Sequence, residues 1–433
     1  MPVTIAQIQE AVARTREARE RVLQHRSTDA VVAALAQTAK NWLDPNSPWR
    51  ARAIAEATGP TRFSEAMVNE AVNLTFGALT PEAFGELLDR ELGNRRVLDE
   101  FCLRGRAHSK AIGPRMIAHI LAGNVPPPGV VSICRGLLLR AANIVRVSSH
   151  DPVFPALFVE SLREVDNELA DCVAVLDWPK QEMALTQAVL AEANAVIAYG
   201  DDMTISALKR LAPPDAQFLS YGHKVSFAVV AKEAMTSENL PALAEAAAFD
   251  ASVYDQQGCL SPHLFYVEER GELGPRKFAE ALAQAMDAYQ QRVPRGQLTP
   301  EEAASVSQVR QSYEFRGASD RRVAVWASPT PNAWTVIYED DPSFTASCLH
   351  RTVFVKPTDG YKRVLDSVKR FSSQISTVGV VPLNERAMGF AADLAKMTVH
   401  RVCPIGQMQR PPLSWHHDGR ANLADLVSWT DLG

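Results

Sequence analysis

The stretch Asn143-Ile-Val-Arg-Val-Ser148 begins the pattern that decides the fold. It reads as an apolar strand, and residues 152–168 behind it have apolar side chains at helical spacing. Residues 172–178 then read as a strand again. Because strands and helices alternate here with short connections, the region predicts βαβ units and a mainly parallel sheet. The expected fold class is therefore α/β.

The alternation continues on both sides of this stretch. A short apolar run at 117–122 precedes a predicted helix at 130–141. On the other side, helix-like residues 181–193 lead to a strand at 195–200 and a helix at 201–211. The strand at 195–200 is continuously apolar, as expected when both faces of a parallel sheet are covered.

The chain is long enough for several domains. Residues 31–43, 62–74 and 81–92 each show helical spacing, whereas strand and helix patterns resume after residue 223. Four parts are expected: a helical N-terminal region that packs on the next part (1–105), a first α/β domain (106–222), a second α/β domain (223–405) and a C-terminal tail (406–433). Residues 421–429 of the tail read as a short helix.

Composition favours a soluble protein of the reducing cytoplasm. Apolar residues make up 46% of the 433 residues, and the net charge of −5 provides no basic surface for nucleic acid or membranes. Arginines interrupt the most apolar span, 129–147, which argues against a transmembrane helix, and no secretory signal is seen. The six scattered cysteines have no CxxC spacing, so neither a zinc site nor a disulfide framework is predicted.

The most pointed candidate for chemistry is Cys259 in Tyr254-Asp-Gln-Gln-Gly-Cys-Leu-Ser-Pro262. It lies in a loop between a helix-like run at 242–250 and a strand-like run at 263–267. A thiolate presented there can attack a carbonyl and hold an acyl group as a thioester. Taken alone, the residue is more readily explained as a small buried hydrophobe.

Three strand ends carry polar groups that suit a ligand. Asn124, in Gly-Asn-Val-Pro, can donate its amide to an oxyanion, although, taken alone, it is more readily explained as a helix-capping or turn residue. Arg146 can hold a phosphate or ribose, or can be an ordinary exposed arginine. Gly200 and Asp201 open a helix, where Asp201 would repel a phosphate and instead cap the helix or face a ribose hydroxyl.

Several familiar motifs are absent: GxGxxG, GxxxxGK[ST] and HExxH. His416-His417-Asp418 places three metal-ligand types side by side. Adjacent side chains point in different directions, so a surface or interface turn is favoured there and no metal is expected.

Together these pieces resemble the LuxC-type fatty acyl-CoA reductases, a branch of the aldehyde dehydrogenase superfamily. The resemblance runs from about residue 100 to the C-terminus and more loosely over the N-terminal helices. It rests on residues 119–126, 145–154, 221–224, 255–262, 350–355, 401–406 and 415–419. It implies an aldehyde dehydrogenase-like fold with a Rossmann-type nucleotide-binding domain, an α/β catalytic domain and a helical N-terminal region.

The resemblance also implies roles for single residues. Cys259 falls at the nucleophile, and Asn124 falls at the asparagine that stabilises the oxyanion. The cofactor-binding residues implied are Arg146, Ser148, His150, Gly200, Asp201 and Ser220, with Arg146 at the lysine that contacts the adenosine ribose. Ser148 and His150 beside Arg146 favour NADPH, with NADH left open. Cys348 falls near the glutamate that binds the nicotinamide ribose.

One departure points to the reaction. Leu219-Ser-Tyr-Gly222 lies where oxidising aldehyde dehydrogenases have Leu-Glu-Leu-Gly. Ser220 is a poor base, so water should not hydrolyse the thioester readily. His223 could replace that base, although a structural histidine is the commoner case.

The function expected is therefore NADPH-dependent reduction of an acyl-CoA to the aldehyde with release of CoA. Two alternatives stay open: an aldehyde dehydrogenase working oxidatively, with CoA or with water, and a non-redox acyl carrier or transferase that uses Cys259. The resemblance implies a homo-oligomer and leaves room for a partner enzyme that donates acyl groups.

Overall fold

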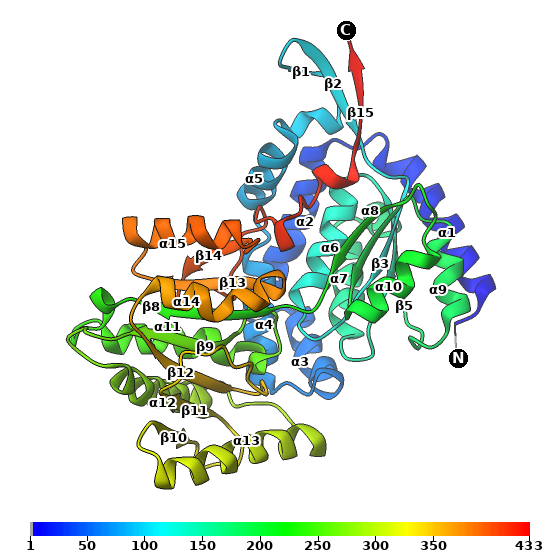
Figure 1. Cartoon of the computed structure of the whole chain (residues 1–433). Helices are drawn as coiled ribbons and strands as arrows, with labels where there is room; N and C mark the ends of the chain where they lie inside the picture. Colours follow the sequence, from blue (N-terminus) through cyan, green and yellow to red (C-terminus); the bar gives the residue numbers. More distant parts are fainter. Residues whose placement is uncertain (1–2) are drawn as a thin grey trace. The chain divides into compact units, whose positions relative to one another are not determined.

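The computed structural model describes residues 3–433, which form two compact units (Figure 1). The first unit contains the residues up to Thr61, Val68–His223 and Pro412–Gly433. The second contains Arg62–Met67 and Lys224–Pro411. Among residues 3–433, no helix combines the length and the apolarity needed to cross a lipid bilayer.

The first unit is built on a five-stranded parallel sheet in the order β5-β4-β3-β6-β7. The strands are β3 (Met116–Ile120), β4 (Ala142–Arg146), β5 (Val173–Leu176), β6 (Ala195–Tyr199) and β7 (Gln217–Tyr221). All residues of β3 and β6 are buried. The predicted βαβ alternation and parallel sheet are confirmed.

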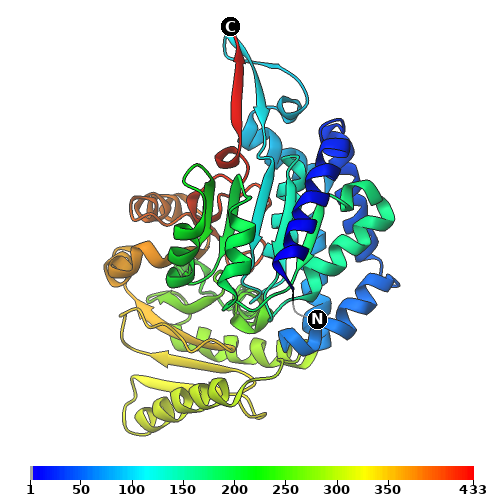
Figure 2. The ribbon, with the colours of Figure 1, turned by 90° about the vertical axis from the view of Figure 1, so that its right-hand side faces the viewer.

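Helices cover both faces of this sheet. One face carries α6 (Pro127–Leu138) and α7 (Val153–Val165), on which α2 and α3 pack. The other carries α1 (Ile5–Ala18), the dark blue helix in Figure 2, which packs on α9 and on β4. The remaining helices are α2 (Thr28–Leu43), α3 (Pro48–Thr61), α4 (Glu65–Gly77), α5 (Pro81–Leu92), α8 (Asn167–Ala170), α9 (Met183–Leu190) and α10 (Asp202–Leu211).

The helices expected within the first 105 residues are present, and their ends follow local chemistry. Helix α5, for example, begins after Thr80, whose hydroxyl accepts a hydrogen bond from the Ala83 N–H. It ends at Gly93, whose φ of 78° lies in the left-handed region that glycine adopts without strain.

A small antiparallel sheet corrects one prediction. Its strands are β1 (Cys102–Arg104), β2 (Ala107–Ile112) and β15 (Ser428–Leu432), all drawn at the top of Figure 1. The helix predicted at 421–429 is wrong: the segment forms one short turn at Ala424–Leu426 and then enters β15. Strand β15 pairs with β2, and Ser109 and Asp431 hydrogen-bond across 322 residues of sequence, a partner that local periodicity cannot show.

The second unit holds a seven-stranded sheet in the order β10-β11-β12-β9-β8-β13-β14. Only the β10–β11 pair is antiparallel. The strands are β8 (Val225–Val230), β9 (Pro262–Glu268), β10 (Val323–Ala327), β11 (Thr335–Glu339), β12 (Thr352–Thr358), β13 (Ile375–Val381) and β14 (Arg401–Pro404).

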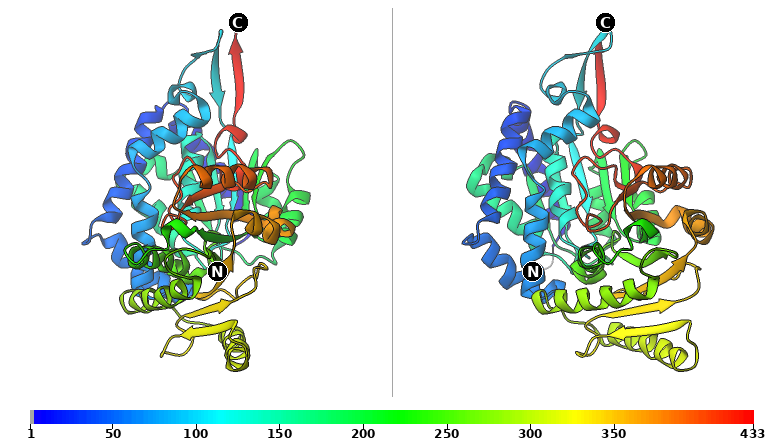
Figure 3. Two further views of the ribbon diagram at one scale, coloured as in Figure 1. Left: turned by 60° about the vertical axis from the view of Figure 1, so that its left-hand side comes forward. Right: turned by 90° about the vertical axis from the view of Figure 1, so that its left-hand side faces the viewer.

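Two helical layers cover this sheet, and the two faces of β8 show why five of its six residues are apolar. Ala228 and Val230 point to the core under α11 (Leu240–Ser252) and α12 (Pro275–Arg292), whereas Phe227 points to the opposite core. That second core lies under α14 (Tyr361–Val368) and α15 (Glu385–Lys396). Helix α13 (Pro300–Ser319) packs along the edge strand β10 (Figure 3).

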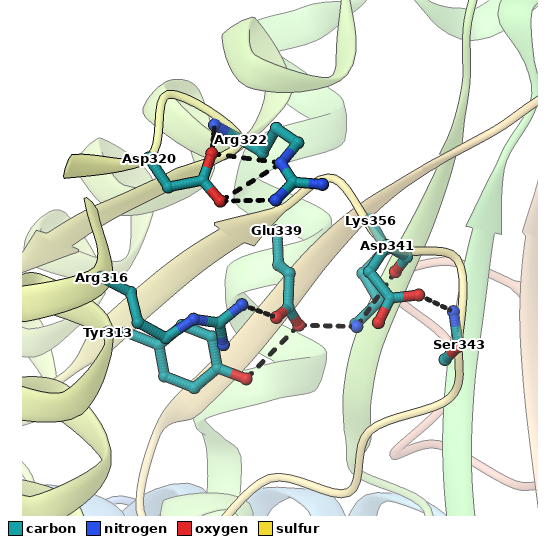
Figure 4. A network of polar contacts seen from close by, with 8 residues as sticks. All are labelled: Tyr313, Arg316, Asp320, Arg322, Glu339, Asp341, Ser343 and Lys356. Atoms are coloured by element: carbon teal, nitrogen blue, oxygen red, sulfur yellow. Dashed lines mark hydrogen bonds and ion pairs between the residues drawn. The ribbon is translucent and has the colours of Figure 1, made fainter.

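A buried charge network ties α13, β11 and β12 together (Figure 4). The Lys356 Nζ atom, fully buried, lies 2.8 Å from Glu339 Oε2 and donates to the Asp341 carbonyl. Arg316 donates to the other oxygen of Glu339, and the Tyr313 hydroxyl also donates to that carboxylate. Because Lys356 is paired and hydrogen-bonded, its burial carries no unbalanced charge.

Candidate active site and cofactor pocket

A cavity of about 540 Å³ opens at the carboxyl ends of four strands in the first unit. Its walls come from segments that follow β3, β4, β5 and β6, and we call it the strand-end pocket. Strands β3 and β6 are neighbours at the centre of the sheet. The chain adds β4 and β5 on the β3 side and β7 on the β6 side, so the strand order reverses between β3 and β6. In open α/β sheets, such a switch point is where nucleotides bind.

Five of the six predicted cofactor residues line the strand-end pocket: Arg146, Ser148, His150, Gly200 and Asp201. Ser220 is not among the lining residues. It lies in β7, where it pairs with Ala198 of β6.

The strand-end pocket also contains residues that we did not predict. Asp177 and Lys180 follow β5, and Thr204 lies in the first turn of α10. The segment after β5 could have been found by the reasoning used for the ends of β4 and β6, since carboxyl ends of parallel strands share one edge.

Arg146 and Lys180 give the strand-end pocket two cationic groups. The Nε and Nη2 atoms of Arg146 donate to the Trp178 carbonyl at 3.3 and 3.1 Å, which holds the guanidinium at the pocket wall. Burial lowers the pKa of Arg146, and the nearby Asp177 opposes that shift. An arginine held in this way suits a phosphate group.

Asp201 caps the helix that follows it. Its Oδ1 atom accepts a hydrogen bond of 2.7 Å from the Thr204 N–H, which lowers the pKa of Asp201. The capping alternative for this residue is therefore confirmed. Since a carboxylate already occupies the N-terminus of α10, a phosphate there is disfavoured.

Gly123 shapes the turn that presents Asn124. Its φ of 77° is left-handed, and a Cβ atom there would lie 2.6 Å from the Ser148 Cβ. A glycine is therefore needed for both the conformation and the close approach. Asn124 follows as an exposed residue in the bend before α6.

Behind the strand-end pocket, a buried polar chain fixes one tyrosine. The Asn143 Nδ2 donates to the Ala141 carbonyl, so its Oδ1 faces His119 Nε2 at 3.0 Å as an acceptor. His119 Nε2 then carries the proton, and Nδ1 accepts from the Ser132 hydroxyl at 2.7 Å. Ser132 in turn acts electrostatically on Tyr199, which lines the pocket.

This chain predicts acid sensitivity. Burial lowers the pKa of His119 to about 4, from 6.5 in the unfolded chain. Between pH 6.5 and pH 4, only the unfolded chain binds a proton at this histidine. The free energy of unfolding that is present above pH 6.5 therefore falls as the pH falls, by about 3 kcal/mol in total. Urea unfolding at pH 7.5 and 4.5 should show a smaller acid loss in His119→Gln than in the wild type. Equal losses would contradict the assignment.

In the second unit, the loop that carries Cys259 has an unusual backbone. Tyr254, Asp255 and Gln256 have φ values of 54°, 51° and 65°, all left-handed. Each such residue costs about 1–2 kcal/mol. The Ser261 N–H then donates to the Gly258 carbonyl, which closes a turn with Cys259 at its first corner. Cys259 is partly exposed there.

The side chain of Gln256 offsets part of that cost. It is fully buried, and its Nε2 donates to the carbonyls of Pro262 and Thr352 at 2.9 and 3.0 Å. Its Oε1 accepts from the Thr352 N–H at 2.9 Å. One amide therefore ties the cysteine loop to the starts of β9 and β12.

A second left-handed run faces the first. Leu349, His350 and Arg351 have φ values of 67°, 56° and 61°. Arg351 forms a buried ion pair of 2.9 Å with Asp255, and the Gln257 amide lies 3.1 Å from His350 Nδ1. Burial lowers the pKa of His350. The two strained segments hold each other in place.

Hydrogen bonds also fix the backbone of the nucleophile candidate. The Ser226 hydroxyl donates to the Cys259 carbonyl at 2.7 Å and accepts from the Thr377 N–H at 3.1 Å. Behind the loop, the Gln409 amide donates to Ser261 Oγ at 2.9 Å. The carbonyl of Cys259 is thereby turned toward β8, and its side chain stays at the corner of the turn.

Cys348, His223, His417 and Asp418 do not line the strand-end pocket. Cys348 is partly exposed in the second unit, and burial raises its pKa. His223 is exposed between β7 and β8. His417 and Asp418 lie in a short turn. No group of residues that could hold a metal ion is found in the part of the chain that the structure describes.

Comparison with known proteins identifies the family to which the chain belongs. The family described as acyl-CoA reductase (LuxC) matches residues 23–429. The long-chain acyl-protein thioester reductase of Aliivibrio fischeri is 29% identical over 80% of this chain and 69% of its own length. The protein of the same name from Vibrio harveyi is 28% identical over 80% of this chain and 70% of its own length.

Solved structures establish the fold. A benzaldehyde dehydrogenase from Corynebacterium glutamicum matches all of this chain and 91% of its own, with a TM-score of 0.70 at 12% identity. A salicylaldehyde dehydrogenase from Pseudomonas putida G7 matches all of this chain and 90% of its own, with a TM-score of 0.71 at 14% identity. The fold is that of the aldehyde dehydrogenases, as the sequence predicted.

Proposed function

Because the chain belongs to the LuxC family of acyl-CoA reductases, we propose that it reduces an acyl-CoA to the aldehyde with NADPH, through a thioester on Cys259. The observation that carries this proposal is the strained, clamped loop that places Cys259 at the corner of a turn. Strain of this kind persists only where the surrounding structure over-determines it, and it clusters at active sites.

The proposed reaction begins at the Cys259 sulfur. The thiolate attacks the thioester carbonyl carbon, a new carbon–sulfur bond forms, and the negative charge moves to oxygen. Asn124 and the backbone N–H of Cys259 are the proposed donors to that oxyanion, each worth about 2.7–4 kcal/mol in comparable sites. The bond to the CoA sulfur then breaks, CoA leaves as a thiolate that takes a proton from water, and the acyl group stays on Cys259.

The strand-end pocket is the proposed cofactor site. It lies at the sheet's switch point, and it offers Arg146 and Lys180 to phosphates and several hydroxyl groups to a ribose. A reduced nicotinamide bound there would supply the hydride that converts the acyl group to an aldehyde. Cys259 is released when its carbon–sulfur bond breaks. Ser220 in place of a glutamate base leaves the thioester unhydrolysed until then.

The choice of NADPH predicts a selective effect at Arg146. Arg146→Gln should weaken NADPH binding about tenfold or more, because a charge-assisted hydrogen bond to the 2′-phosphate is lost. NADH, which lacks that phosphate, should be affected less. Fluorescence titration of both reduced cofactors measures this, with Arg210→Gln on the exposed side of α10 as the control. Equal losses for both cofactors, or tighter binding of NADH by the wild type, would contradict the preference.

The relatives are named for acyl-protein thioesters, so the acyl donor needs its own test. We propose that acyl-CoA is itself an acyl donor to Cys259. We also propose that an acylated partner protein, which carries its acyl group as a thioester too, is a second donor. A panel of acyl-CoAs from short to long chains, with NADPH consumption and aldehyde as readouts, tests the function. Failure to form any aldehyde would overturn it.

The reverse assay separates the oxidative alternatives. Aldehyde and NADP⁺ should yield product only when CoA is present. Acid formation without CoA would favour a hydrolytic aldehyde dehydrogenase. A protein whose melting temperature does not respond to either reduced cofactor would instead fit a non-redox acyl carrier.

A further inference from the structure

Arg135, in the third turn of α6, is a buried cation without a counter-ion. Arg135 is 4% exposed, and its Nε atom is buried without a hydrogen-bond partner. No described residue forms an ion pair with it or accepts a hydrogen bond from its terminal nitrogens, which are not among the fully enclosed atoms. An unpaired buried charge costs several kcal/mol, so this guanidinium calls for an anion.

A group of stacked aromatic rings lies within electrostatic reach of this charge. Tyr221 stacks on His417 with ring centres 4.0 Å apart, and Tyr199 stacks on Tyr221 at 4.8 Å. Trp415 stacks on the His417 ring as well, at 4.7 Å. Burial raises the pKa of both tyrosines and lowers that of His417, and the charge of Arg135 acts on all three groups.

A second hydrogen-bond donor near Arg135 also lacks a partner. The Tyr221 hydroxyl is enclosed and has no partner. Tyr199, by contrast, is engaged with Ser132. Asp418 and Glu91 act electrostatically on Tyr221, but Arg135 has an ion pair with neither. The Glu91 carboxylate instead accepts hydrogen bonds from Asn422, Leu423 and Ala424.

From this arrangement we propose that Arg135 and Tyr221 form a carboxylate-binding subsite in the first unit, for a small organic acid with an apolar body. One cation matches the single charge of a carboxylate, whereas a phosphate dianion would call for more positive charge. The guanidinium fork suits two carboxylate oxygens, the phenol adds a third donor, and the rings suit an apolar chain. Arg135 and Tyr221 do not line the strand-end pocket, whereas Tyr199 does, so the subsite adjoins the proposed cofactor site and uses other polar groups.

Isothermal titration of the full-length protein with hexanoate tests the subsite, with hexanamide and inorganic phosphate as comparison ligands. Hexanoate should bind in preference to both. Arg135→Met should raise its Kd about 10- to 100-fold, since a charge-assisted contact is lost, and Tyr221→Phe should raise it about 2- to 10-fold. Arg14→Met, which removes the same charge from an exposed position of α1, should change nothing.

Stability gives a readout that does not depend on the ligand. Without carboxylate, Arg135→Met should melt at a higher temperature than the wild type, because a buried charge without a partner is removed. The proposal is overturned if hexanoate does not bind, if Arg135→Met binds it equally well, or if phosphate binds more tightly. A lower melting temperature of the ligand-free variant would also overturn it, by assigning Arg135 a structural role.

The carboxylate could belong to a free acid or to the far end of an acyl chain. A second experiment, which rests on the proposed function, distinguishes these two sources. Adipyl-CoA and hexanoyl-CoA have equal chain lengths and differ in the terminal carboxylate. If the chain end occupies the subsite, Arg135→Met should lower the ratio of their kcat/KM values about tenfold. An unchanged ratio with lost hexanoate binding assigns the subsite to a free acid. If no thioester is turned over, the proposed function fails while the titration still decides the subsite.

Discussion

Cys259→Ala is expected to abolish acyl-enzyme formation and to lower turnover by at least roughly 10⁴-fold, the scale seen when a covalent nucleophile is removed. In the absence of cofactor, the wild-type protein incubated with acyl-CoA should gain the mass of one acyl group, because hydride is lacking and Ser220 is a poor base. Intact mass spectrometry reads this directly. The variant should stay at its own mass, since alanine has no sulfur to acylate.

Cys348→Ala is the matched control. Cys348 is also a partly exposed cysteine of the second unit, but burial raises its pKa, which disfavours the thiolate. This variant should be acylated as the wild type is. An adduct that persists in Cys259→Ala, or disappears in Cys348→Ala, would show that the nucleophile has been assigned to the wrong residue.

The second large effect is expected on stability. Arg351→Met should lower the free energy of unfolding of the second unit by about 3–5 kcal/mol, because it leaves a buried carboxylate without its cation. The Arg351 side chain is 1% exposed and that of Asp255 is 7% exposed. After the substitution Asp255 would keep the Gly296 N–H at 2.9 Å. Urea unfolding followed by tryptophan fluorescence measures the loss.

Arg322→Met provides the comparison on the surface. Arg322 also pairs with an aspartate, Asp320, at 2.9 Å, but its side chain is 72% exposed (Figure 4). That substitution should cost less than about 1 kcal/mol. In Arg351→Met, the added change Asp255→Asn should recover part of the loss, since the stranded charge is removed. Equal losses for Arg351→Met and Arg322→Met would contradict the role given to the buried pair.

Acylation and stability are linked at the cysteine loop. Asp255, which Arg351 holds, is one of the three left-handed residues just before the turn that carries Cys259. Arg351→Met should therefore also slow acylation, while Arg322→Met should not. If Arg351→Met is destabilised but is acylated at the wild-type rate, the ion pair does not help to position the Cys259 thiol.

Much of the strand-end pocket could be predicted from sequence because strand ends are local features. Arg146 ends an apolar strand and Ser148 and Gly200 follow apolar strands, and the carboxyl ends of parallel strands meet at one edge. Lys180 was missed although it follows the same rule after β5. Ser220 was carried over from the resemblance, and it does not line the pocket because it lies within β7.

By itself, the sequence determined the alternation of strands and helices, a mainly parallel sheet and the position of Cys259 between a helix and a strand. These features depend on the periodicity and chemistry of neighbouring residues. The tertiary structure decided the strand β15, the clamp of Gln256 on β9 and β12, and the pairing of Asp255 with Arg351. It also decided that Arg135 is buried without an anion. Each depends on groups far apart in the chain, and burial and pairing are properties of their contacts in space.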